Sequence, residues 1–211
     1  MLAQLFQSWA TVLTQPAVAT FDRERPAASL DKVLVAILLA GLVAGVGSAL
    51  GQLVLLLFLP GLVTDGERAF DPLFAEQMAP TAVGIVVGVI VAPLAALIGF
   101  FVWAGVLFLV AKVLGGPGDF VAHSYLLSLS AAPLTAINGV LSIIPCLALL
   151  AAIPVFIYQL VLTTLALQSA HRFTVGRAIA VWLIPVAVLF FLGLCFAVLI
   201  FALVIAALGG G

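Results

Sequence analysis

The chain has 211 residues, of which 66% are hydrophobic and 7% are charged, and its formal net charge is −1. A soluble domain has roughly 45–50% apolar and about 25% charged residues, so this composition argues against a soluble enzyme. The nearly balanced charge also gives no electrostatic reason to expect a nucleic-acid partner.

The first residues have the pattern of a short amphipathic helix. Apolar side chains recur at helical spacing over residues 2–13, with Trp9 among them, and polar side chains fill the opposite face. Such a helix is too short to span a bilayer and is predicted to lie in the membrane interface, where it could act as a curvature-inducing wedge. Pro16 should end it, the charged segment 21–26 is predicted to be a solvated loop, and Ser29 is a plausible N-cap for the next helix.

Five apolar stretches follow, each long enough to span a membrane. A spanning helix needs about 20 mostly apolar residues. The predicted spans are residues 32–59, 81–114, 120–140, 146–168 and 175–208, with a polar loop at 60–80. The predicted fold class is therefore all-α: a polytopic membrane protein with five transmembrane helices and an N-terminal interfacial amphipathic helix. We divide it into an N-terminal cytoplasmic segment, 1–30, and a transmembrane domain, 31–211.

The basic residues predict the orientation. If the N-terminus is cytoplasmic and there are five spans, six of the seven basic residues lie inside and Arg68 alone lies outside. Cytoplasmic loops carry the excess of Lys and Arg, so we predict a cytoplasmic N-terminus and an external C-terminus. The composition, rich in Ala and Gly, favours a bacterial inner membrane.

Small residues in the first span predict close helix packing. Gly41, Gly45, Gly47 and Gly51 form two G-x-x-x-G pairs, which let a second helix approach closely in lipid. Packing within the chain's own bundle is favoured over a dimer seam. The two cysteines, Cys146 and Cys195, lie in apolar sequence and are predicted to be buried packing residues.

No pattern predicts catalysis or a cofactor. Gly116-Pro117-Gly118-Asp119 resembles the G-x-G-D motif of aspartyl intramembrane proteases, but no second carboxylate lies inside a predicted span. Asp119 is better interpreted as the N-cap of the third span. His123 with Ser124, Ser128 and Ser130 does not reproduce a nucleophile–base–orienter set, because no carboxylate is positioned in that segment except Asp119 before it, and His171 is not expected to act in catalysis either. We therefore expect a non-catalytic protein without cofactor or metal.

Polar residues inside the spans leave one alternative open, a small-solute or ion transporter or channel. Its candidate polar pathway is Gln52, Asn138, Tyr158, Gln159 and Thr163. Since no span carries an ionisable residue near its middle, ion-coupled transport is disfavoured, and hydrogen bonds between helices explain these side chains equally well.

The ordered motifs resemble the Yip-one domain family. They include Trp9 followed by Val12-Leu13-Thr14 and Pro16, Ser130-Ala131-Ala132-Pro133, and Gly176-Arg177-Ala178. The family-characteristic positions, all interpreted as structural, are Trp9, Pro16, Gly115, Gly116, Phe120, Pro133, Pro145, Tyr158 and Gly176. Trp9 is interpreted as an interface anchor and Tyr158 as a packed, hydrogen-bonded phenol.

The resemblance implies five spans, a cytoplasmic N-terminus and no catalytic residues. Eukaryotic members are implicated in vesicle trafficking and in binding prenylated Rab proteins, but the short N-terminal region here departs from that pattern, so Rab binding is not carried over. We expect a membrane-organising, trafficking-like or partner-binding component. Its expected partners are the lipid bilayer and either a second copy of the chain or another membrane protein.

Overall fold

The computed structural model describes residues 2–58 and 82–209 of the chain, and the regular structure within these ranges is entirely helical. The elements are α1 (Leu2–Thr14), α2 (Val18–Glu24), the 3-10 helix η1 (Arg25–Ala27), α3 (Leu30–Phe58), α6 (Ala82–Val113), α7 (Phe120–Leu141), α8 (Pro145–His171) and α9 (Val175–Gly209). Five of them, α3, α6, α7, α8 and α9, are long and apolar enough to cross a membrane. The all-α fold with five spans and an additional N-terminal helix is confirmed.

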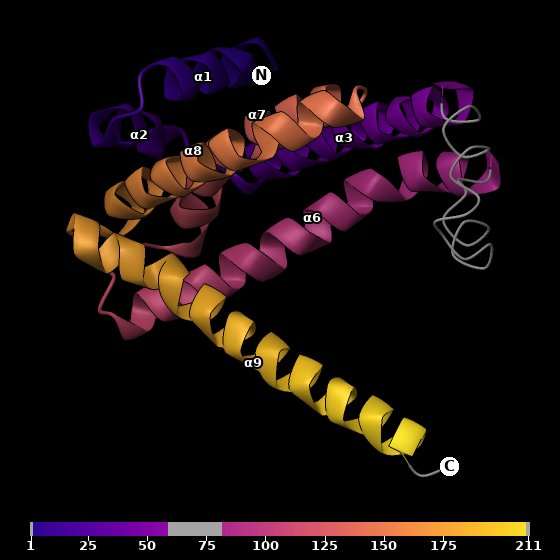
Figure 1. Cartoon of the computed structure of the whole chain (residues 1–211). Helices are drawn as coiled ribbons and strands as arrows, with labels where there is room; N and C mark the ends of the chain where they lie inside the picture. Colours follow the sequence, from indigo (N-terminus) through magenta and orange to yellow (C-terminus); the bar gives the residue numbers. More distant parts are fainter. Residues whose placement is uncertain (1, 59–81, 210–211) are drawn as a thin grey trace.

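Helix α7 is the centre of the bundle. It packs along α3 and α8 (Figure 1), and 67% of its apolar stretch is buried, compared with 6% of that of α9. Its buried side chains include small and hydroxylated residues such as Ser124 and Ser128, as well as large ones such as Leu126 and Leu129. Small side chains let helix backbones approach closely in a membrane protein. Because α7 has several close helical neighbours, it carries small side chains on all of its faces.

The glycines of α3 pack within the chain's own bundle, as predicted. Gly41 and Gly45 face α6, whereas Gly47 and Gly51 face the end of α7 and the turn that follows it. A Cβ atom on Gly47 would collide with the backbone of Gly139. The two G-x-x-x-G pairs thus serve two different neighbours, one on each side of α3.

Individual residues at the turns determine where α6 ends and where α7 and α8 begin. Gly115 takes a φ of 82°, a left-handed conformation that glycine adopts without a steric penalty, and this turns the chain after α6. The side chain of Asp119 caps α7, as predicted, by accepting a hydrogen bond from the backbone N–H of Ala122 at 2.9 Å. Pro145 is the first residue of α8, where its missing N–H costs no helix hydrogen bond.

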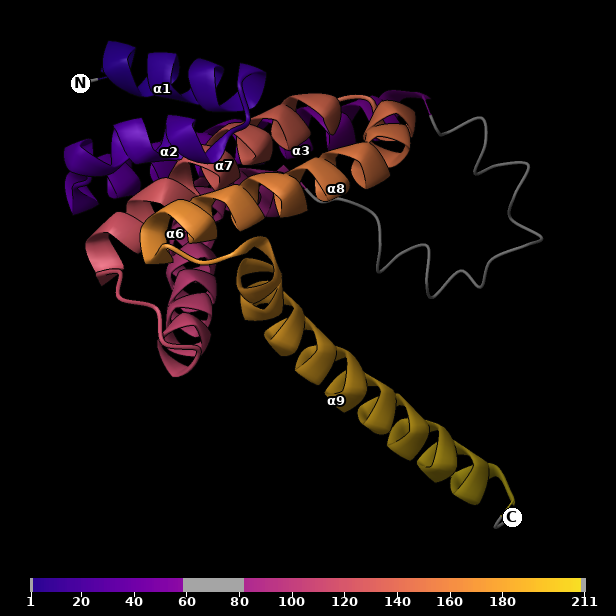
Figure 2. The same cartoon turned by 90° about the vertical axis from the view of Figure 1, so that its left-hand side faces the viewer.

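Helix α9 diverges from the other spans. It packs on α6 and α8 near its beginning, where Ala178 and Val181 are buried, and then runs away from them in both views (Figures 1 and 2). Large apolar side chains along its outer part, such as Phe190 and Phe201, are more than 60% exposed. Such a surface is suited to lipid rather than water.

The predicted burial of the cysteines is wrong. Cys146 at the start of α8 and Cys195 in α9 are both exposed. In a membrane protein an apolar neighbourhood does not imply a buried position, because the lipid-facing surface of a span is as apolar as its packed surface.

Candidate functional site

The N-terminal elements form a cap on the spans. We define the cap as α1, α2 and η1, which lie against α7 and α8 (Figure 2). Leu5, Trp9 and Val12 of α1 are buried. The indole of Trp9 is 6% exposed, so it is packed into the protein and does not serve as the predicted interface anchor. The apolar face of α1 is satisfied by protein, whereas Leu2 and Phe6 remain about half exposed.

Tyr158 fixes the position of α1 along the bundle. Its hydroxyl donates a hydrogen bond of 2.6 Å to the carbonyl of Leu13, so the predicted packed, hydrogen-bonded phenol is confirmed. Tyr158 precedes the last residue of α8, His171, by 13 positions (171 − 158). At 1.5 Å per residue this is about 20 Å along the helix. The end of α1 therefore lies beside α8, well before its end.

Helix α2 provides the second attachment of the cap. Phe21 is completely buried, and the carboxylate of Asp22 accepts a hydrogen bond of 2.6 Å from the Ser169 hydroxyl. Asp22 also pairs with Arg172 at 3.5 Å, and the Arg25 guanidinium donates to the Ser169 carbonyl at 3.4 Å. The prediction that this charged segment is a solvated loop is wrong, because most of it is helical, Asp22 and Arg25 bond to the end of α8, and Phe21 inserts into the core.

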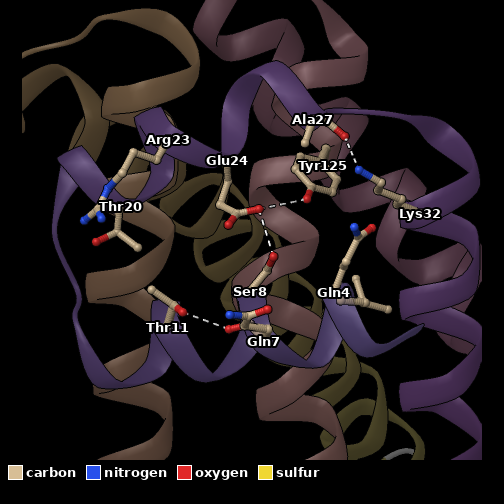
Figure 3. A pocket seen from close by; sticks show the side chains of 11 residues that line it. Gln4, Gln7, Ser8, Thr11, Thr20, Arg23, Glu24, Ala27, Lys32 and Tyr125 are labelled. Atoms are coloured by element: carbon tan, nitrogen blue, oxygen red, sulfur yellow. Dashed lines mark hydrogen bonds between the residues drawn. The ribbon is translucent and has the colours of Figure 1, made fainter. Parts of the chain in front are cut away.

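A polar pocket lies between the cap and the spans. We call it the cap pocket; α1, α2, η1, α3 and α7 line it, and its volume is about 530 Å³ (Figure 3). Its side chains are mostly polar, among them Gln4, Gln7, Arg23, Glu24 and Lys32. This polar cavity, formed by five elements where the cap meets the spans, is therefore the candidate functional site.

Glu24 organises the cap pocket. Its Oε2 accepts hydrogen bonds from the Ser8 hydroxyl at 2.9 Å and from the Tyr125 hydroxyl at 3.1 Å (Figure 3). Within the described residues, Oε1 has no hydrogen-bond partner. The Lys32 ammonium donates to the Ala27 carbonyl at 2.7 Å and lies 5.5 Å from the centre of the Tyr125 ring. The pocket thus presents a positioned carboxylate and a lysine ammonium, both beside Tyr125.

Arg23 supplies a second cation to the cap pocket. Its Nε donates to the Ala19 carbonyl at 3.3 Å, one helical turn earlier in α2. Its side chain lines the pocket and the residue is exposed. The pocket therefore presents both signs of charge, with cationic groups from two elements.

The two histidines form a buried pair. Nδ1 of His123 lies 2.9 Å from Nε2 of His171, and Nε2 of His123 lies 3.0 Å from the carbonyl of Ala104. A carbonyl can only accept, so in the neutral pair His123 donates to Ala104 and accepts from His171. The remaining Nδ1 of His171 is buried without a partner in the described structure. A Cβ at Gly116 would stand 2.5 Å from this nitrogen, which explains the glycine there.

This pair has no arrangement for acid–base catalysis. The rings of Phe108, Phe120 and Phe173 surround it, and His123 and His171 are 0% and 1% exposed. Residues 2–58 and 82–209 contain no group of three or more His, Cys, Asp or Glu side chains that could hold a metal ion. The histidine pair is best described as a packed hydrogen-bonding unit.

The candidate polar pathway is divided by the structure. Asn138, Gln159 and Thr163 line one cavity between the spans. Gln52 lines a different cavity between α3 and α6, and Tyr158 bonds to α1 instead. Three of the five predicted residues are therefore brought together and two are not.

The family-characteristic positions mostly have structural roles that the contacts explain. Pro16 follows the end of α1, Phe120 begins α7 and packs near His123, and Pro133 is buried within α7. Gly176 is different: a Cβ there would meet nothing within 4 Å, and nothing in the structure explains a glycine at that position.

Sequence reasoning missed the residues that hold the cap. Ser8 and Glu24 are separated by 16 positions, and Glu24 and Tyr125 by 101. No local pattern connects residues so far apart. The one available signal was the position of Phe21 directly before four charged residues, since the large apolar area of an aromatic side chain favours its burial.

The comparison with protein families agrees with this architecture. No curated protein and no solved structure matches the chain. The model of the Yip1 domain matches residues 10–198, which include most of the cap, the first four membrane-spanning helices and most of α9. The chain therefore belongs to the Yip1 domain family.

Proposed function

We propose that this Yip1-domain protein is a non-catalytic membrane-organising component that binds a protein partner through the cap pocket, on the cytoplasmic side of a bacterial inner membrane. The observation that carries the proposal is the cap pocket itself: Arg23 and Glu24 belong to a cap that hydrogen-bonds to α7 and α8, and Lys32 belongs to α3. In the predicted topology six of the seven basic residues lie on the same side of the membrane as the N-terminus, and this excess supports a cytoplasmic N-terminus.

The chemistry of the pocket suggests how a partner would be recognised. Arg23 and Lys32 are suited to a carboxylate or to backbone carbonyls of a partner segment, and Oε1 of Glu24 is suited to an N–H or O–H donor. A partner segment that presents both kinds of group would bond to the pocket without displacing Ser8 or Tyr125. Preorganised groups of this kind reduce the entropy cost of binding.

Crosslinking from single cysteines tests the proposal. Cys146 and Cys195 are exposed, so both are first replaced by Ala. One cysteine is then placed at Gln7 or Arg23 beside the pocket, with Thr174, in the turn between α8 and α9, as the control position. Crosslinks are formed in intact membranes and identified by mass spectrometry. We expect a distinct protein to be captured from Gln7 and Arg23 but not from Thr174; the same species from all three positions, or lipid alone, would contradict the proposal.

A solute pathway is a second candidate, supported by the cavity that Asn138, Gln159 and Thr163 share. It requires a flux of small solutes or ions through liposomes containing the protein, and this flux should fall in Asn138→Leu. If the protein adds no flux to that of empty liposomes, the pathway is eliminated.

A further inference from the structure

A second cavity lies among the membrane-spanning helices, away from the cap. We call it the span cavity; α3, α6, α7, α8 and α9 all contribute to it, and its volume is about 570 Å³. Its wall is mainly apolar and aromatic, with Phe100, Trp103, Phe156 and Trp182. Ligand sites in proteins typically measure roughly 300–1,000 Å³ and combine an apolar lining with a few polar groups. The span cavity has both properties.

Several polar groups of the span cavity lack protein partners. In the described part of the chain, neither the Asn138 carboxamide nor the Thr135 hydroxyl makes a side-chain hydrogen bond. Gln159 donates its Nε2 to the Thr163 hydroxyl at 3.1 Å, and its carbonyl oxygen has no donor. Polar groups without partners are costly within a bilayer, where little water is available to bond them. A ligand that has hydrogen-bonding groups of its own would therefore satisfy these side chains.

The cavity opens toward lipid. Phe156 and Val186 on its wall are 61% and 41% exposed, and Trp103 is 36% exposed. These residues belong to α8, α9 and α6, and α9 diverges from the other two in both views (Figures 1 and 2). A molecule dissolved in the bilayer can thus enter laterally between the helices.

The uncharged lining of the span cavity favours neutral lipids over charged ones. No Asp, Glu, Lys or Arg lines the span cavity in the described residues. A charged headgroup placed there would lose its hydration without gaining an opposite charge. A neutral lipid with ester and hydroxyl groups loses far less, because amide and hydroxyl side chains can replace its bonds to water.

We propose that the span cavity binds a neutral glycerolipid of the diacylglycerol type. An acyl chain lies against Phe100, Phe156 and Trp182, while the hydroxyl and ester oxygens bond to Asn138, Thr135 and Gln159. Asn138 lies about one turn before the end of α7, so the polar end of the lipid lies toward the face of the membrane at which α7 ends. The site is separate from the cap pocket and does not depend on the function proposed for it.

Photolabelling of the full-length protein in phosphatidylcholine vesicles tests this site. The vesicles contain a diacylglycerol with a diazirine in one acyl chain, and labelled peptides are located by mass spectrometry. We expect saturable labelling of the peptides that carry Trp103 and Phe156. Excess unlabelled diacylglycerol should compete with the probe, whereas extra phosphatidylcholine should not; equal competition by both lipids would overturn the selectivity for a neutral headgroup.

Two glycines of α6 provide a matched pair of variants. A Cβ would meet nothing within 4 Å at either Gly99 or Gly105, but of these two only Gly99 lines the span cavity. Gly99→Phe should fill the cavity and abolish saturable labelling, and Gly105→Phe should leave it unchanged. Equal labelling of the two variants would refute the site, provided that both elute as folded protein in size-exclusion chromatography.

Asn138→Leu tests the polar contact without filling the cavity. The loss of one net hydrogen bond should weaken competition by diacylglycerol about five-fold. Unchanged competition would refute the role of Asn138. A solute flux that Asn138→Leu abolishes, without any saturable lipid labelling, would overturn the proposal in favour of a pathway.

Discussion

Tyr125→Phe should loosen the cap from the spans. The substitution removes one of the two hydroxyl groups that donate to Oε2 of Glu24 and keeps the ring that packs in the core. A hydrogen bond to a charged group contributes roughly 1.5–3 kcal/mol, and we use the lower end because Glu24 is only partly buried. A loss of about 1.5 kcal/mol corresponds to roughly a ten-fold lower ratio of attached to detached cap.

Trp9 provides the assay for cap attachment. The chain has three tryptophans, and replacing Trp103 and Trp182 by Phe leaves Trp9, on the buried face of α1, as the reporter. Its fluorescence is followed during urea titration of protein in lipid nanodiscs, where the spans stay inserted. Exposure of the indole should shift the emission to longer wavelength. In Tyr125→Phe the midpoint should move to lower urea, with the slope unchanged.

Thr11→Val is the matched control for Tyr125→Phe. Thr11 also lines the cap pocket, but its hydroxyl donates to the Gln7 carbonyl within α1 and makes no bond to a span. Its midpoint should therefore stay close to that of the parent protein. If Tyr125→Phe and Thr11→Val shift the midpoint equally, or neither shifts it, the bond to Glu24 does not hold the cap and the argument fails.

Three further predictions concern the spans and their turns. Gly47→Ala should destabilise the packing of α3 on α7 by about 1–3 kcal/mol, because its Cβ would meet the backbone of Gly139. Gly105→Ala should be neutral or slightly stabilising, because its Cβ would meet nothing within 4 Å. SDS titration followed by circular dichroism measures both variants, and equal effects would contradict the packing of α3 on α7. The backbone hydrogen bond from Ala122 lowers the pKa of Asp119 below its ordinary 3.8, so its stabilisation of α7 is present above that value and is lost as the pH falls through the lowered pKa. Asp119→Ala should lower the free energy of unfolding by about 1 kcal/mol at pH 7 and remove this acid sensitivity from stability measurements between pH 6 and pH ~2. If the variant shows the same acid dependence as the parent protein, Asp119 is not a stabilising N-cap of α7. Finally, a cysteine at Thr174, in a variant without the native thiols, should react with an impermeant maleimide only after cells are opened; labelling of intact cells would reverse the predicted orientation.

Physical constraints that act along the chain made several features predictable from sequence. A bilayer requires each span to be about 20 apolar residues long, and the five stretches meet that requirement without any knowledge of packing. The cap of α7 by Asp119 and the turn at Gly115 depend on residues within a few positions of one another. The resemblance to the Yip-one family also rested on ordered local motifs, and the family match confirms it.

The tertiary structure decided which apolar surfaces meet protein and which meet lipid. Trp9 could have entered lipid or the core, and the cysteines could have been packed or exposed, because both environments are apolar and the sequence pattern is the same in either case. The cap pocket and the span cavity likewise depend on residues brought together from distant positions, such as Glu24 with Tyr125 and Asn138 with Gln159. The sequence by itself determined how many helices cross the membrane and where they end, since hydrophobicity and local hydrogen bonds act over short stretches of chain. Only the packed structure determined which of their faces form sites, because that depends on contacts between segments that the chain keeps far apart.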